Sequence, residues 1–176
     1  MKNFCFKFQV LVFFVCSLIL SSCSNQKKAD NKNEIEAFEK YDKIRLLSYS
    51  KHRKEYERLK LITISKDSII IPSVEIVDNV ILNKYQREKI LNILTTKDIE
   101  ICTLADCYQP RHILLFYKKN KIIDFYEFCC ACGGSRQSEG IKISGICTEQ
   151  GLELIKIFKE MKLKNDGEEG ENYKYF

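Results

Sequence analysis

Apolar and polar positions along the chain predict several short strands. Runs of four to eight residues that are rich in β-branched or aromatic side chains and bounded by polar or turn-forming residues are typical of β-strands. Segments of this kind are found at residues 44–47, 59–64, 68–71 and 74–81. A further pair, residues 112–117 and 122–128, flanks the polar stretch Lys118-Lys119-Asn120-Lys121. We expect this pair to form a β-hairpin.

Two other segments have the three-to-four-residue apolar spacing of an amphipathic helix. The first, residues 84–94, follows Asn83, and Gln86 stands three residues after it. That spacing is typical of a capping box, in which the two residues satisfy free N–H groups of the first turn. The second helix is expected to begin after Thr148 as its N-cap. A weaker pattern at residues 34–41 predicts a short helix.

The order of these elements predicts the fold class. Pairs of strands are separated by single helices, without the regular alternation that a parallel sheet requires. We therefore expect an α+β domain with a mainly antiparallel sheet, two or three helices packed on it, and support from disulfide bonds.

The predicted hairpin brings distant residues together on paper. If the turn centres on Lys119-Asn120, His112 lies opposite Glu127, and the same register carried outward places Cys107 opposite Cys132. Because side chains alternate between the faces of a strand, His112, Glu127 and Cys129 are then expected at the open end of the buried face. A shift by one residue would change these partners.

The N-terminal segment predicts export and lipidation. Lys2 and Lys7 precede an apolar run at residues 10–20, which is followed by the sequence Leu20-Ser21-Ser22-Cys23. A positive region, an apolar region and small residues, in that order, form a secretory signal. The last four residues match the lipobox of bacterial lipoproteins, in which the cysteine is diacylated, usually N-acylated, and becomes the first residue after cleavage. The alternative is an ordinary cleaved signal with a cysteine there by chance.

This interpretation divides the chain into four parts. Residues 1–22 form the lipoprotein signal peptide, and residues 23–34, which lack large apolar side chains, form a flexible tether. Residues 35–163 are expected to form a single domain, and residues 164–176 a frayed C-terminal tail. Removal of the signal leaves 27 basic residues against 24 acidic ones, a net charge of +3, which gives no support for nucleic-acid binding.

Six cysteines follow the lipidation site, and three interpretations of them remain open. Disulfide bonds are favoured, since exported proteins tend to be oxidised. The alternatives are a zinc site, for which a C-x-x-C pair is only weak evidence, and thiol chemistry, which the glycines after the pair disfavour. The candidate disulfide or metal residues are Cys102, Cys107, Cys129, Cys130, Cys132 and Cys147.

Arg111, His112 and Glu127 form a candidate polar site at the end of the predicted hairpin. Arg111 and His112 could bind a ligand or take part in catalysis, but no nucleophile is fixed beside His112 by the local sequence. We therefore favour a structural role in which His112 points inward and is satisfied by Glu127. No catalytic residue and no cofactor are assigned.

The segments Cys107-Tyr108-Gln109-Pro110-Arg111-His112 and Phe128-Cys129-Cys130-Ala131-Cys132 resemble a group of small uncharacterised lipoproteins of the Bacteroidetes, especially flavobacteria. These combine a C-Y-x-P-R-H element, a hairpin and a C-x-x-C-like element. The resemblance covers residues 82–163 and Cys23, and the additional Cys130 departs from it. It implies an envelope location and a single domain, but no activity.

Together these features predict a lipid-anchored protein of the bacterial cell envelope with a binding or structural role. Its expected partner is the membrane, through the lipid on Cys23, and its ligand or protein partner is not assigned. In the Bacteroidetes, surface-displayed lipoproteins often carry acidic residues soon after the lipidated cysteine, whereas Ser24-Asn25-Gln26-Lys27-Lys28 follows it here. This favours the outer membrane, facing the periplasm. The competing functions are a zinc-binding module and a thiol-dependent enzyme using Cys107, His112 and residues 129–132.

Overall fold

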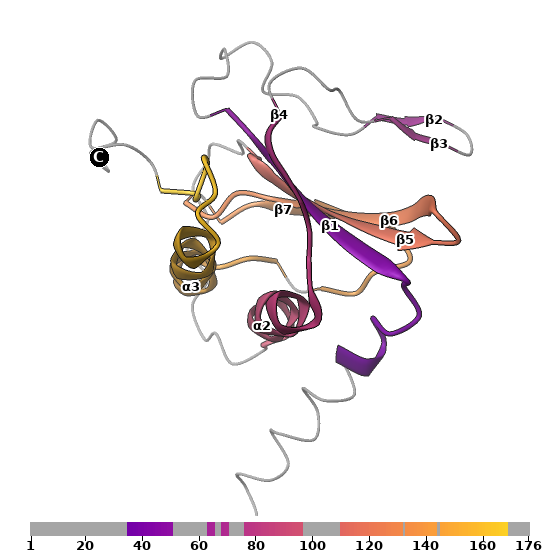
Figure 1. Cartoon of the computed structure of the whole chain (residues 1–176), viewed down its shortest axis with the longest axis horizontal. Helices are drawn as coiled ribbons and strands as arrows, with labels where there is room; N and C mark the ends of the chain where they lie inside the picture. The colour runs from indigo at the N-terminus through magenta and orange to yellow at the C-terminus, as the bar shows by residue number, and fades with distance from the viewer. Residues whose placement is uncertain are drawn as a thin grey trace, which may run out of the picture.

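Five antiparallel strands form the central sheet, in the spatial order β4-β1-β5-β6-β7 (Figure 1). The computed structural model describes residues 35–50, 63–65, 68–70, 76–96, 110–131, 133–143 and 145–168. The strands of this sheet are β1 (Lys43–Tyr49), β4 (Ile76–Ile81), β5 (His112–Lys118), β6 (Lys121–Phe128) and β7 (Ser135–Gln137). A separate two-stranded sheet consists of β2 (Thr63–Ser65) and β3 (Ser68–Ile70). The predicted α+β class with an antiparallel sheet is confirmed.

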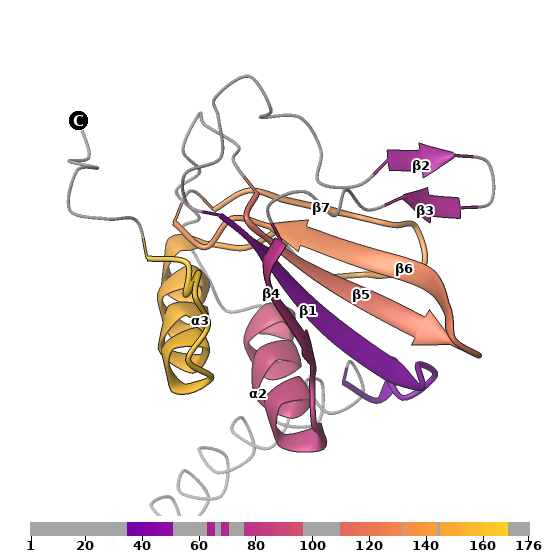
Figure 2. The ribbon, with the colours of Figure 1, turned by 45° about the horizontal axis from the view of Figure 1, so that its top comes forward.

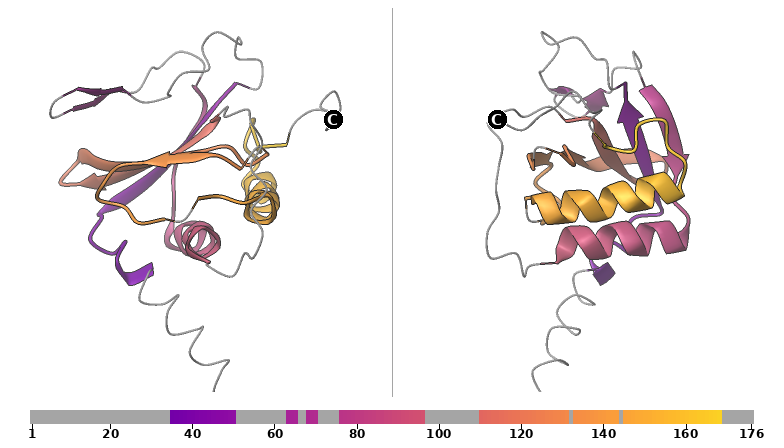
Figure 3. Two further views of the ribbon diagram at one scale, coloured as in Figure 1. Left: turned by 180° about the vertical axis from the view of Figure 1, so that it is seen from behind. Right: turned by 90° about the vertical axis from the view of Figure 1, so that its left-hand side faces the viewer.

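Two helices, α2 (Lys84–Thr95) and α3 (Thr148–Glu160), lie side by side on one face of the sheet (Figure 3). The capping box predicted for α2 is present: the Asn83 side chain accepts from the Gln86 N–H, and the Gln86 side chain accepts from the Asn83 N–H. The predicted start of α3 is wrong by one residue. Its N-cap is Cys147, whose N–H donates to the Gln150 side chain at 2.9 Å, and Thr148 is the first helical residue.

Apolar side chains are buried on both faces of the sheet. The larger core lies between the sheet and the two helices, and it includes Leu46, Leu114, Phe116, Tyr126, Phe128, Ile90, Leu91, Leu94, Leu154 and Phe158. A smaller core occupies the opposite face and contains Leu47, Tyr49, Ile113, Leu115, Tyr117 and Phe125. The central strand β5 contributes to both. This explains why residues 112–117 form a continuous apolar run instead of alternating.

The hairpin has the predicted turn but a different register. Lys119 and Asn120 form a two-residue turn, both with positive φ, and Lys118 lies opposite Lys121. An irregularity between Phe116 and Tyr117 then shifts the pairing by one residue. Beyond it, His112 lies opposite Phe128 instead of Glu127. Because a shift of one residue exchanges the faces of a strand, the predicted partners of His112 are wrong.

Other expectations were met only in part. Of the helix expected at residues 34–41, residues 35 and 36 are helical and residues 37–40 form a turn, in which the Phe38 N–H donates to the Ile35 carbonyl group. The strands expected at residues 59–64 and 74–81 lie partly outside the described residues. The described parts of these two segments belong to β2 and β4, respectively. Strand β7 was not expected at all, because its three residues lie within a glycine-containing segment. Figure 2 shows this short strand beside β6, at the edge of the sheet.

Candidate functional site

His112 is the first residue of β5, and its side chain is buried on the face of the sheet that carries the helices. Its backbone pairs with Phe128 on β6 and with Ser48 on β1. The imidazole ring packs between the rings of Phe128 and Phe158, with centroid distances of 5.5 and 4.9 Å. The side chain is fully buried. The prediction that His112 points inward is therefore confirmed, and α3 contributes one wall of its surroundings.

The hydrogen bonds of His112 define its tautomer. Its Nε2 atom lies 2.9 Å from the main-chain carbonyl oxygen of Asn165. A carbonyl oxygen only accepts, so Nε2 carries the proton and donates. The other ring nitrogen, Nδ1, is then an acceptor, and it lies 4.0 Å from the Sγ atom of Cys130. A neutral imidazole fits both neighbours, since a thiol is a weak donor.

The surroundings of His112 favour its neutral form. Burial lowers the pKa of His112 from its usual 6.5 to about 4, opposed by the bond to Asn165 and assisted by the positive charge of Arg111. Removal from water disfavours the charged imidazolium more than the single carbonyl acceptor stabilises it. At neutral pH His112 is therefore an uncharged side chain with one donor and one acceptor.

Cys130 is a buried free thiol beside this ring. Burial raises the pKa of its thiol far above the usual value, and the negative charge of Asp166 acts in the same direction. Two glycines allow the close packing around it. A Cβ atom on Gly151 of α3 would lie 2.0 Å from the Cys130 carbonyl oxygen, and one on Gly167 would lie 3.2 Å from Sγ. Gly167 also has a φ of +89°, which a residue with a side chain rarely adopts.

Residues 164–168, here called the C-terminal strap, cover His112 and Cys130. Asn165 is buried, and its side-chain Nδ2 donates to the Tyr49 carbonyl oxygen at 2.6 Å. The N–H groups of Lys164 and Asn165 donate to the two carboxylate oxygens of Asp78, at 2.9 and 3.0 Å. The Ser48 hydroxyl also donates to Asp78. Residues 164–168, expected to belong to a frayed tail, are therefore held against β1 and β4.

This arrangement has little capacity for nucleophilic chemistry. A catalytic cysteine needs access to substrate and a lowered pKa, so that the thiolate forms. Cys130 has a raised pKa, and its partner His112 is neutral and has a lowered one. Both side chains are also shielded from solvent. The geometry instead suits a buried polar contact that orients the C-terminal strap against the sheet.

Glu127 does not belong to this cluster. It lies on the opposite face of β6 from Phe128, where its carboxylate forms an ion pair with Arg136 of β7 at 2.9 Å. The Glu127 side chain is completely buried and that of Arg136 is 27 % exposed. Arg111 lies beside His112, and its N–H donates to the Phe128 carbonyl oxygen. The predicted site of Arg111, His112 and Glu127 is thus divided between two faces of the sheet.

The cysteines of the described residues are in two states. Cys129 and Cys147 are disulfide-bonded, whereas Cys130 is free. The neighbouring residues Cys129 and Cys130 are therefore in different states, one bonded and one free. Cys102, Cys107 and Cys132 lie outside the described residues, as does Cys23. The register that placed Cys107 opposite Cys132 does not hold beyond the irregularity in β5, so that argument for their pairing is lost.

Within the described ranges, no group of three or more His, Cys, Asp or Glu side chains is arranged to hold a metal ion. His112 and Cys130 could supply two ligands, but His112 uses Nε2 for Asn165 and the thiol of Cys130 strongly retains its proton. A structural zinc site needs four ligands, with its cysteines as thiolates. The described part of the predicted cluster therefore fits zinc poorly.

A second buried polar cluster escaped the sequence analysis. Asp124 accepts from the Tyr41 hydroxyl at 2.6 Å and from the Ser138 hydroxyl at 2.5 Å. Burial and this carboxylate raise the pKa of Tyr41. Gly140 approaches so closely that a Cβ atom there would lie 2.3 Å from Asp124 Oδ1. An acidic residue inside the apolar run at residues 122–128 was the one available signal, but its partner Tyr41 lies 83 residues away.

Comparisons with protein-family models, with curated proteins and with solved structures gave no match. Among the helices that the structure describes, none is long and apolar enough to cross a membrane.

Proposed function

We propose that this protein is a lipid-anchored component of the bacterial cell envelope with a binding or structural role. The observation that carries the proposal is the sequence Leu20-Ser21-Ser22-Cys23 after a positively charged and then apolar segment. Lipid on the thiol and on the new amino group of Cys23 gives two or more acyl chains. One chain holds a protein only marginally, whereas two give stable attachment. The Lys27-Lys28 pair after the anchor supports the periplasmic side of the outer membrane.

A role without catalysis is supported by the buried cluster at the C-terminal strap. Its nucleophile, Cys130, is protonated and enclosed, and the neighbouring His112 is neutral. The residues that first suggested chemistry instead connect β1, β4, β5 and α3. In this proposal they stabilise a domain that presents its surface to a partner.

We further propose that disulfide bonds support the domain. Cys129 precedes the free Cys130, and Cys147 caps α3, so bonds at these two positions would tie the end of β6 and the start of α3 to other parts of the chain. Their partners would come from the cysteine set named above. Each bond is expected to contribute about 2–4 kcal/mol, mainly by restricting the unfolded chain.

Replacement of the proposed lipidation site tests the anchor. In a bacterial host, the full chain is expected to enter the detergent phase and to carry a lipidated N-terminal peptide beginning at Cys23. Cys23→Ala should release the protein into soluble fractions or leave the signal uncleaved. Cys16→Ala is the matched control, since it removes a cysteine of the apolar run without altering the lipobox. A mature N-terminus elsewhere, without lipid, would contradict the proposal.

A further inference from the structure

The tip of the β5–β6 hairpin concentrates positive charge. Lys118, Lys119 and Lys121 are all exposed around the turn at Asn120, and none of them forms an ion pair within the described residues. Ile123 follows on β6 and is 41 % exposed. Lysines beside an exposed aliphatic side chain are the combination that binds the interface of an anionic membrane.

The hairpin tip is also held in a defined position. Lys119 and Asn120 have φ values of 47° and 62°, as a tight two-residue hairpin turn requires. The N–H of Lys119 donates to a carboxylate oxygen of Asp42 at 2.6 Å. This bond fixes the tip to the residue just before β1.

The chain enters the described domain at this same end. Ile35, the first described residue, lines a surface pocket of about 520 Å³ together with Asp42, Lys43 and Lys84. Asp42 therefore adjoins both the hairpin tip, through its bond to Lys119, and Ile35, through the pocket that both residues line. Only residues 24–34 separate Ile35 from Cys23, and a chain of that length spans at most about 40 Å when fully extended. A lipid on Cys23 would thus keep this end of the domain close to the membrane.

We propose that the hairpin tip, defined as Lys118, Lys119, Lys121 and Ile123, rests on the anionic phospholipid headgroups of the membrane that holds Cys23. The inference depends on the proposed lipid anchor and adds an orientation to it. The lysines supply charge complementary to the headgroups, and Ile123 supplies an apolar contact. The anchor supplies proximity, which raises the effective concentration of the surface.

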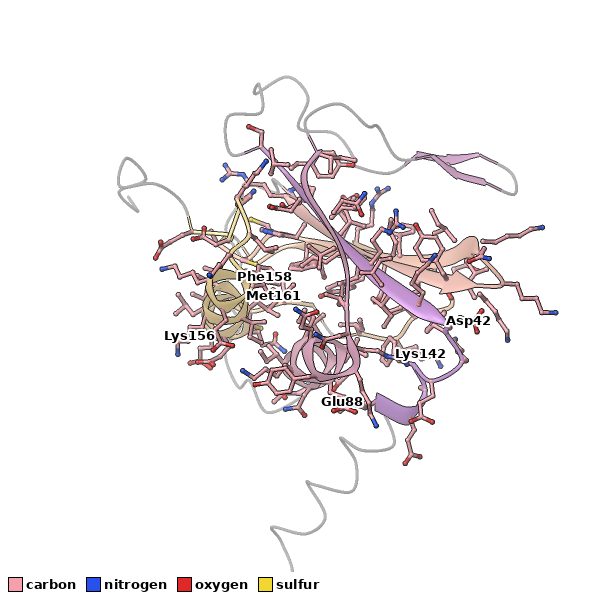
Figure 4. All side chains as sticks on the ribbon, in the orientation of Figure 1. Asp42, Glu88, Lys142, Lys156, Phe158 and Met161 are labelled. Carbon is pink, nitrogen blue, oxygen red and sulfur yellow. The ribbon has the colours of Figure 1, made fainter. Side chains whose placement is uncertain are left out.

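The helical end of the domain offers a contrasting surface. On α3, Lys156 pairs with Glu153 and Lys159 pairs with Glu168, at 2.6 and 2.7 Å. Lys89 of α2 pairs with Glu160. Figure 4 shows Lys156 on the opposite side of the molecule from Asp42. The charges there are balanced locally, so that end should remain away from the headgroups.

Labelling of individual lysines in the membrane-bound protein tests the orientation. The full lipidated protein is reconstituted in phosphatidylcholine vesicles with or without phosphatidylglycerol, and an amine-reactive reagent is followed by mass spectrometry. Lys118, Lys119 and Lys121 should be labelled at least threefold more slowly on the anionic vesicles, and 0.5 M salt, on the order of a 4 Å screening length, should remove the difference. Lys156 should react equally in every sample.

A charge-neutralised variant sharpens the result. Lys118→Gln with Lys121→Gln should abolish the phosphatidylglycerol-dependent protection of Lys119, whereas Lys156→Gln with Lys159→Gln should leave it intact. Equal labelling on both vesicles would overturn the orientation, provided that the N-terminal peptide of the same sample carries lipid. An unlipidated peptide would instead overturn the anchor. Protection in cells but not on vesicles would indicate that the hairpin tip binds an acidic protein instead of lipid, and would also overturn the proposal.

Discussion

The imidazole of His112 donates a hydrogen bond to the main-chain carbonyl oxygen of Asn165, 53 residues further along the chain and 2.9 Å away. This bond joins the central strand β5 to the C-terminal strap. The side-chain amide of Asn165 in turn donates to the Tyr49 carbonyl oxygen of β1, and its main-chain N–H donates to the Asp78 carboxylate of β4. One buried polar network therefore connects three neighbouring strands with the segment that follows α3.

Removal of the His112 ring should destabilise the domain. His112→Ala leaves the Asn165 carbonyl group without its donor, which costs about 1–3 kcal/mol, and opens a cavity between Phe128 and Phe158. The free energy of unfolding, measured with urea, should fall by at least this amount. Lys156→Ala on the exposed side of α3 is the control and should change it by less than about 0.5 kcal/mol. An unchanged stability of His112→Ala would contradict the role assigned to the network.

Stability should depend on pH through His112. The pKa of His112 is about 4 in the folded protein, against the usual 6.5 of a histidine in the unfolded chain. The unfolded chain therefore binds more protons than the folded protein between these two pH values. Stability is therefore complete above pH 6.5 and falls as the pH decreases towards 4, by about 3 kcal/mol in all. His112→Gln, which cannot titrate, should have a shallower slope in this window. Equal slopes for the two proteins would show that His112 does not remain neutral in the fold.

The thiol of Cys130 should be inaccessible in the folded protein. Under native conditions at pH 8, iodoacetamide should modify Cys130 far more slowly than an exposed thiol, because the side chain is buried and its pKa is raised. Denaturation without reductant should make it reactive at once. Peptide mapping that finds Cys130 in a disulfide, or rapidly alkylated in the native state, would rule out the enclosed thiol.

The count of free thiols provides a further check. Six cysteines follow Cys23, and disulfides within one chain consume them in pairs. Since Cys130 is free while Cys129 and Cys147 are bonded, at least one more of the six must also be free in a monomer. Titration of the denatured, unreduced protein should therefore give two thiols if two bonds form. Six thiols together with bound zinc would favour a metal-binding module instead.

Two glycines offer a matched test of packing. Gly151→Ala would place a Cβ atom 2.0 Å from the backbone oxygen of Cys130, so α3 would have to move away from the sheet. We expect a loss on the order of 3 kcal/mol, at the upper end of the usual overpacking cost. In Gly145→Ala the nearest atom is the Ser135 hydroxyl oxygen at 3.9 Å, and the change should be tolerated. Comparable thermal denaturation of the two variants would contradict this account.

Local sequence determined the elements of the fold that depend on neighbouring residues. The capping box of Asn83 and Gln86 predicted where α2 begins, because both partners lie within one helical turn. The polar turn at Lys119-Asn120 likewise predicted the β5–β6 hairpin. The alternation of side chains along the strands of this hairpin predicted the inward position of His112. The signal segment and Cys23 are also features of local sequence, but their function remains a prediction.

Tertiary structure decided the partners of these residues. One irregular position, between Phe116 and Tyr117, changed the face of every later residue on β6 relative to the prediction, because the side-chain period of a strand is two. Glu127 therefore pairs with Arg136, and His112 meets Asn165 and Cys130 instead. No local pattern marked Asn165, which lies in a charged segment and becomes buried only because β1 and β4 supply Tyr49 and Asp78. Hydrogen bonds between residues dozens of positions apart leave no periodic trace in sequence, so only the assembled sheet could define this cluster.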